Sequence, residues 1–234
     1  YCSPLSLRRL NGMLSEGELP RNPVAMTFDD GYADNLAQAK PLLERYSIPA
    51  TVFVTTGQVG CGREFWCVEL ERIFLQSAVL PKELCFDIDG ITIEWDLDGA
   101  ETYDASAHEE WNVEVEGDPT PRHAAYRSVC QLLRPLSEAR RHEALEKLLT
   151  WSRTEQEGRN SHLPITRAGL TELDAGEIID VGAHTVTHAH LSSLPVTAQQ
   201  KEIRASKTAL EEILGHSVKT FAYPFGSRSD FNAE

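Results

Sequence analysis

The stretch VAMTFDDG, residues 24–31, closes an apolar run with two adjacent aspartates and a glycine. A short, nearly continuous apolar run is typical of a strand that is buried on both faces of a parallel sheet. Asp29 and Asp30 are therefore expected at the C-terminal end of a strand, which is the edge where ligands bind in open α/β sheets and barrels. Adjacent carboxylates repel each other unless a cation or a shared proton offsets their charge. The stretch thus predicts a cation site that needs further ligands from elsewhere in the chain.

The segments that follow this stretch alternate between helix and strand. Residues 34–46 are predicted to form a helix, with Asp34 as a candidate N-cap and a bend or restart at Pro41. The β-branched run at 48–57 predicts a second buried strand, which ends at Gly57. The order of strand, helix and strand favours an α/β fold.

The βα pattern is interrupted between residues 60 and 160. Within this segment, residues 83–97 alternate apolar and polar side chains around an Asp-Gly pair at 89–90, which predicts a β-hairpin. Two polar helices are expected after the hairpin. We therefore predict that residues 60–160 are an inserted α+β segment, and that residues 1–59 and 161–234 form the α/β part.

The βα pattern returns after the inserted segment. Residues 177–184 predict a strand that ends at a histidine, and residues 218–226 predict a final strand. The helix between them has capping-box spacing at Thr197 and Gln200, and Gly215 supplies a C-terminal stop. This second strand end is therefore expected at the same edge of the sheet as the aspartates.

Composition excludes several classes of partner. The 234 residues include 36 acidic and 22 basic side chains, so the formal charge is −14 and the chain is a poor match for nucleic acid or anionic membranes. No apolar stretch approaches the roughly 20 residues of a membrane span. The first residues do not have the pattern of an export signal, so a cytoplasmic location with reduced cysteines is expected.

The stretch GAHTVTH, residues 182–188, supplies the ligands that the aspartates lack. His184 and His188 stand four residues apart and can point the same way from a helical turn or a tight loop. Two imidazoles and one carboxylate, here from Asp30, form a suitable site for a borderline divalent ion, and zinc is the favoured ion. Thr185 follows the first histidine, so this is not the HExxH pattern of zinc proteases. Asp29 is then the natural general base.

TFDDG at 27–31 and HTVTH at 184–188, each after a predicted strand, resemble the first two motifs of the polysaccharide deacetylase family. These proteins are carbohydrate esterases related to chitooligosaccharide deacetylase. The resemblance implies an irregular (β/α) barrel that uses a divalent metal to remove acetyl groups from sugars. It also implies that Asp29 is the catalytic base. The implied metal ligands are Asp30, His184 and His188.

FAYPFG at 221–226 resembles the third motif of the family, in which an aromatic residue gives a backbone N–H to the oxyanion. Phe225 matches that aromatic position. The predicted substrate contacts are Tyr32, Tyr223 and Pro224. An acetylated sugar or glycan, such as a precursor in bacterial envelope biosynthesis, is the implied substrate, and the pattern leaves the oligomeric state open.

Two departures from the family pattern accompany the resemblance. The position of the family's arginine holds Ala222. The last motifs of the family, which carry the general acid, are expected beyond Glu234, so the barrel is predicted to be incomplete at its C-terminus. His190 lies two residues beyond His188 and is expected to face away, as a surface or supporting residue.

Two alternatives to the hydrolase follow from the same residues. A catalytically silent sugar-binding or scaffold module would keep the fold without turnover, in line with the alanine at 222. A receiver domain would use paired acidic residues to bind magnesium. A receiver has no use for two histidines and needs an Asp at the end of a later strand, which the 52–56 segment lacks.

Overall fold

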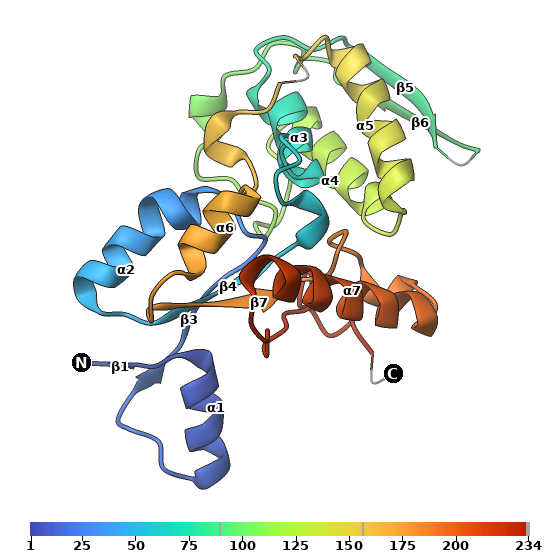
Figure 1. Cartoon of the computed structure of the whole chain (residues 1–234). Helices are drawn as coiled ribbons and strands as arrows, with labels where there is room; N and C mark the ends of the chain where they lie inside the picture. Colours follow the sequence, from blue (N-terminus) through green and yellow to red (C-terminus); the bar gives the residue numbers. More distant parts are fainter. Residues whose placement is uncertain (89, 156, 233–234) are drawn as a thin grey trace. The chain divides into compact units, whose positions relative to one another are not determined.

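The computed structural model of the chain describes residues 1–88, 90–155 and 157–232. The chain divides into two compact units, and Figure 1 shows their elements. The first unit combines Tyr1–Arg63 with Arg159–Glu234, and the second is Glu64–Gly158. The aspartate and histidine motifs all belong to the first unit.

A parallel sheet forms the centre of the first unit. Its strands are β3 (Met26–Phe28), β4 (Ala50–Val54) and β7 (Ile179–Ala183), in the order β3-β4-β7. Every residue of β4 is buried, as expected for a β-branched strand with a neighbour on each side. Because β3 and β7 both run parallel to β4, their C-terminal ends lie at one edge of the sheet.

The structure corrects the predicted burial of the first strand. Among the described residues β3 pairs only with β4, and Met26 and Thr27 are exposed. The apolar run therefore lies on an edge strand rather than between two neighbours. The sheet of β3, β4 and β7 is open, and the described strands do not form the closed barrel that the family resemblance implies.

Helices pack against this sheet through an apolar core. A π-helical segment, Asn35–Ala39, leads into α2 (Lys40–Tyr46), followed after the second unit by α6 (Arg167–Asp174) and α7 (Val196–Leu214). The fully buried core residues include Val52, Leu170, Leu173 and Leu210. Two short parallel strands, β1 (Ser3–Pro4) and β2 (Pro23–Val24), flank α1 (Leu7–Glu16) near the N-terminus.

Several predicted details of these elements are wrong. Asp34 makes no side-chain capping bond, because it already has helical backbone angles. Pro195, not a capping box, precedes α7, whereas Gly215 ends that helix with φ 77° as predicted. Residues 218–226 make one β-bridge, between Ala183 and Phe221, instead of a strand.

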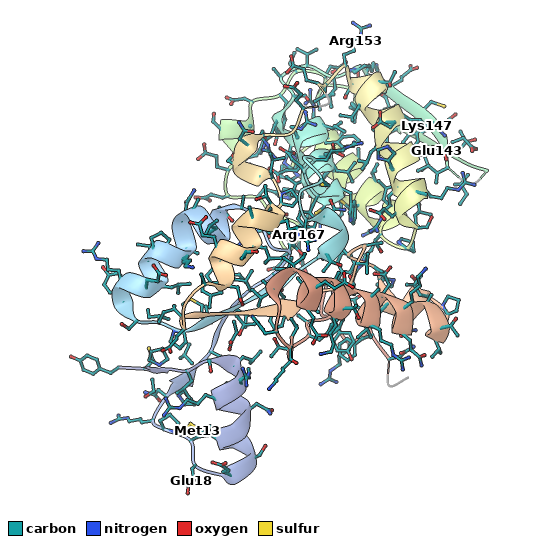
Figure 2. The ribbon with its side chains drawn as sticks, viewed as in Figure 1. Met13, Glu18, Glu143, Lys147, Arg153 and Arg167 are labelled. Atoms are coloured by element: carbon teal, nitrogen blue, oxygen red, sulfur yellow. The ribbon has the colours of Figure 1, made fainter. Side chains whose placement is uncertain are left out.

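The second unit has its own hydrophobic core. Its elements are α3 (Trp66–Glu71), β5 (Glu83–Ile88), β6 (Ile91–Asp96), α4 (Pro121–Leu133) and α5 (Glu138–Ser152). The strands β5 and β6 pair as an antiparallel hairpin, in which Asp89 of the predicted turn lies outside the described residues. Figure 2 labels the pair Glu143 and Lys147 on α5, whose side chains are 3.0 Å apart.

A buried arginine joins the loops of the second unit. Arg122 on α4 has no exposed surface, and its guanidinium donates to the carbonyls of Phe74, Ser77, Ala100 and Glu101. Burying this charge is tolerable because carbonyl oxygens surround its N–H groups. The five cysteines of the chain are free, and no described helix is long and apolar enough to cross a membrane.

Candidate metal centre

Asp30 reaches the edge of the sheet through an unusual backbone conformation. It follows β3 with φ 71°, and Gly31 continues with φ 83°. The N–H of Thr55, just after β4, donates to the Asp30 carbonyl at 3.1 Å. A side chain at position 31 would meet Val54 at 2.9 Å, which explains the glycine that follows the aspartate pair.

His184 follows β7 directly and is 1% exposed. Its backbone N–H donates to the Val54 carbonyl at 3.1 Å. Its Nδ1–H donates to the carbonyl of Ala222 at 2.9 Å, which fixes the tautomer and leaves Nε2 for another partner. The alanine at the position of the family's arginine thus contributes through its backbone.

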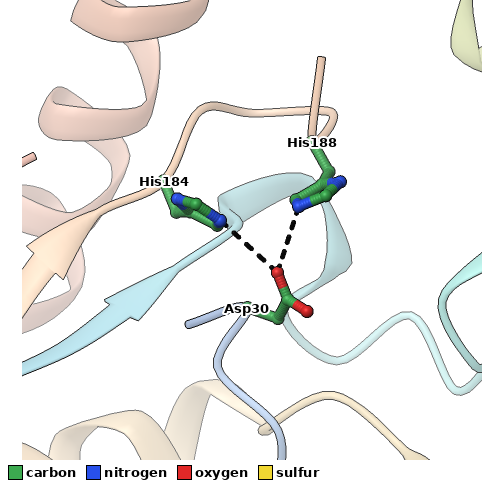
Figure 3. A group of neighbouring side chains, drawn as sticks. All are labelled: Asp30, His184 and His188. Carbon is green, nitrogen blue, oxygen red and sulfur yellow. Dashed lines mark ion pairs between the residues drawn. The ribbon is translucent and has the colours of Figure 1, made fainter. Parts of the chain in front are cut away.

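His188 comes from the loop that follows β7. Figure 3 shows its ring and that of His184 directed at the carboxylate of Asp30. Nε2 of His188 is 3.2 Å from Asp30 Oδ1, and Nε2 of His184 is 3.4 Å from the same oxygen. One candidate ligand atom from each of the three residues lies within 4.8 Å of the others.

These distances fit a shared divalent ion. Two ligand atoms that each lie about 2.1 Å from a tetrahedral zinc ion are about 3.4 Å apart. The separations of 3.2 and 3.4 Å are therefore close to those of ligands on one ion. The structure brings Asp30, His184 and His188 together as candidate ligands.

The charge state of Asp30 follows from its surroundings. Burial alone would raise the pKa of this carboxyl, but its side-chain and electrostatic interactions with His184 and His188 lower the pKa by more. The net effect holds the pKa of Asp30 well below its ordinary value. Asp30 is therefore an anion at neutral pH, as a metal ligand has to be.

The other predicted site residues have different surroundings. Asp29 is exposed and is not one of the three clustered residues, so its carboxylate is accessible to solvent. Phe225, 39% exposed, packs its ring 4.8 Å from that of His188. Tyr223 is 42% exposed and stacks on Phe231.

Two of the predicted substrate contacts have little free surface. Tyr32 is half-buried and forms a β-bridge with Pro164. Pro224 is buried, and its carbonyl accepts the N–H of Gly226 at 2.9 Å in a tight turn. Any contribution of Pro224 to substrate contact would come through this turn, which places Phe225 at φ 67°.

His190 belongs to a second polar group beside this site. Its Nε2 lies 3.0 Å from a carboxylate oxygen of Asp230, which is 1% exposed. The other oxygen of Asp230 accepts the N–H of Ser227 at 2.8 Å. Asp230 therefore joins the histidine loop to the segment that carries Phe225. No sequence pattern indicated a role for this carboxylate, because it lies outside the resembling motifs.

Backbone strain is concentrated at the candidate site. Positive φ in a residue other than glycine is uncommon, and it clusters at functional sites in many proteins. The structure describes seven such residues, and four belong to the site: Asp30, Thr185, His188 and Phe225.

Comparison with known proteins identifies the family of the chain. The polysaccharide deacetylase family model matches residues 16–73 and 154–233, which is more than half of the chain. The chain belongs to the polysaccharide deacetylase family.

Individual relatives match over more limited lengths or at low identity. YxkH of Bacillus subtilis (strain 168), a protein named for the same family, is 41% identical over 49 residues, 20% of this chain and 18% of its own length. The Streptococcus pyogenes deacetylase PplD, solved in complex with acetate, is 18% identical with a TM-score of 0.51, over 99% of this chain and 57% of its own. The BpsB deacetylase domain of Bordetella bronchiseptica is 15% identical with a TM-score of 0.49, over 98% of this chain and 66% of its own. The chain thus spans less than two thirds of each relative, and the likeness to PplD shows the fold.

Proposed function

We propose that this chain carries the metal centre and the base of a hydrolase that removes an acetyl or other N-acyl group from a sugar. One observation carries the proposal. In a member of the polysaccharide deacetylase family, Asp30, His184 and His188 converge at the C-terminal ends of two parallel strands. The open sheet would be part of the family's (β/α) barrel. Residues 60–160 would be an insertion into it.

The three side chains fit a borderline ion such as zinc. Imidazole nitrogens and a carboxylate oxygen suit it, and three protein ligands leave a position open. Ala222 supports this role, because its carbonyl binds Nδ1–H of His184 and keeps Nε2 directed at Asp30. When bound, a divalent ion supplies a Lewis acid for the acyl carbonyl and makes water a better nucleophile at neutral pH.

Asp29 is the proposed general base. It is adjacent to Asp30 in the chain, is exposed, and stands outside the group of candidate ligands. It can therefore accept the proton of the attacking water without holding the metal. The backbone N–H of Phe225, whose ring packs against His188, is the proposed donor to the oxyanion that forms during attack.

The proposed substrate is an acetylated sugar or glycan. Tyr223 and Phe225 expose aromatic surface next to the candidate ligands, and such surface packs well against the apolar face of a sugar ring. Tyr32 would line the same edge. The acetate in the PplD structure is the acid that deacetylation releases, and this supports acetyl as the acyl group.

Metal analysis combined with turnover tests this function. The 234-residue chain should bind one zinc ion, hydrolyse an activated acetyl ester, lose this activity with a chelator, and regain it with zinc. Zinc binding without hydrolysis of the ester would support the catalytically silent module instead. A chain that binds no divalent ion would contradict the proposal.

A further inference from the structure

A carboxylate on α7 holds the loop between the two histidines. Glu202 accepts the backbone N–H of Val186 at 2.8 Å and that of Thr187 at 3.0 Å. Its second oxygen accepts the hydroxyl of Thr187 at 3.1 Å. All three hydrogen bonds go to the residues that separate His184 from His188.

The opposite side of this loop is held by the segment after β4. The N–H of Thr56 donates to the Thr185 carbonyl at 3.2 Å, and the N–H of Gly57 donates to the Val186 carbonyl at 2.8 Å. The approach is so close that a Cβ at position 57 would lie 2.5 Å from the Val186 oxygen. The loop is therefore fixed between backbone donors on one side and Glu202 on the other.

The loop needs such support because its backbone is strained. Thr185 has φ 63° and His188 has φ 52°, a region that residues other than glycine leave unless their surroundings hold them there. Without Glu202, the N–H groups of Val186 and Thr187 would lose a charged acceptor. The loop could then relax toward ordinary angles and turn the ring of His188 away from Asp30.

We propose that Glu202 is a positioning residue of the metal centre, which keeps the imidazoles of His184 and His188 directed at Asp30. The inference rests on the proposed metal-binding function of these three residues. The hydrogen bonds of Glu202 go to the backbone of Val186 and to the backbone and hydroxyl of Thr187, so it acts on the histidines through the loop that joins them.

Titration of the full chain with Co²⁺ tests this role. In Glu202→Ala the dissociation constant for Co²⁺ should rise about 10- to 100-fold, the range found when residues that orient metal ligands are changed. Glu202→Gln keeps an acceptor oxygen and should show a smaller rise. Glu212→Gln is the matched control, because Glu212 is exposed on the same helix, and its affinity should equal that of the wild type.

Spectroscopy distinguishes a positioning role of Glu202 from a general loss of structure in the variant. The visible absorption of bound Co²⁺ reports its ligands and should change in Glu202→Ala, while circular dichroism of the metal-free variant should match the wild type. If Glu202→Ala does not fold, Glu202→Gln is compared with Glu212→Gln instead. A higher dissociation constant for Co²⁺ in Glu202→Gln supports the positioning role, and an equal constant overturns it.

The outcomes distinguish this inference from the proposed function. A folded Glu202→Ala that binds Co²⁺ within about twofold of the wild type, with an unchanged spectrum, would overturn the role of Glu202 and leave the metal centre standing. A wild type that does not bind Co²⁺ would overturn both.

Discussion

Two pairs of histidines, one in each unit, have similar ring separations and different surroundings. The rings of His184 and His188 are 5.1 Å apart, and those of His108 and His123 are 4.9 Å apart. In the second pair, both nitrogens of His123 have protein partners, the hydroxyls of Tyr103 and Thr120. In the first pair, Nε2 of each ring is directed at Asp30.

The difference shows that proximity of histidines does not define a metal centre. His123 is fully buried among aromatic rings, with Trp111 4.4 Å away, and burial lowers its pKa. Its imidazole is therefore a neutral packing residue with its polar atoms satisfied. At the first pair, a carboxylate and a strained loop direct the nitrogens to a common point. The following predictions test this contrast, beginning with the largest expected effect.

The largest effect is expected at Asp29. Asp29→Asn should lower turnover about 10²- to 10⁴-fold, because an amide cannot accept the proton of the attacking water. Its metal content, measured by elemental analysis, should remain that of the wild type. If Asp29→Asn loses the metal and Asp30→Asn keeps it, the two roles are reversed.

Removing one ring from each pair compares the two regions directly. His188→Ala should weaken zinc binding by at least about 100-fold, since it deletes a ligand instead of a residue that only orients one. His123→Ala should leave zinc affinity unchanged and lower the free energy of unfolding by about 2–5 kcal/mol, as expected for truncating a buried side chain. Competition with a chromophoric chelator and urea unfolding measure the two quantities. An equal loss of zinc affinity in His188→Ala and His123→Ala would contradict the proposed difference between the two histidine pairs.

An intermediate effect is expected at Gly57. Gly57→Ala places a methyl group 2.5 Å from the Val186 carbonyl oxygen, so the loop of the first pair must move. Such overpacking costs about 1–3 kcal/mol of unfolding free energy, and zinc affinity should fall with it. Gly60→Ala is a control, because a Cβ there meets nothing within 4 Å, although its φ of 73° adds strain of its own. Zinc affinities that are equal in the two variants would show that the contact does not position the loop.

The smallest effect concerns the interior of the second unit. Burial raises the pKa of Cys130 to about 12. Its thiol should therefore stay protonated at pH 8 and react with iodoacetamide much more slowly than the exposed Cys61 and Cys85. Mass spectrometry of timed samples measures the rates. Labelling of Cys130 as fast as that of Cys61 would show that this interior opens readily.

Sequence patterns predicted the elements that depend on the residues adjacent to one another in the chain. The strand at 50–54 and the glycine stop at 215 both appear where the pattern indicated. The convergence of Asp30 with the histidines also followed, because parallel strands bring their C-terminal ends to one edge.

Features that depend on tertiary contacts did not follow from the sequence. The prediction that β3 is a buried strand was wrong, because a pattern of apolar residues does not reveal how many neighbouring strands pair with a strand. Glu202 and Asp230 lack a local signal, since each binds a loop that lies outside its own segment of the chain. The role of Ala222 was invisible because it is performed by a carbonyl that every residue has.

The parallel pairing of β4 with β7 also affects the order of events during synthesis. The pairing of β3 with β4 needs only the first segment of the chain, but β7 leaves the ribosome after the whole of Glu64–Gly158. Contacts between distant segments form slowly, because a long loop has to close before they contribute. Asp30 therefore emerges well before its histidine partners, and a nascent chain stalled before β7 would hold a carboxylate without the two imidazoles that complete the centre.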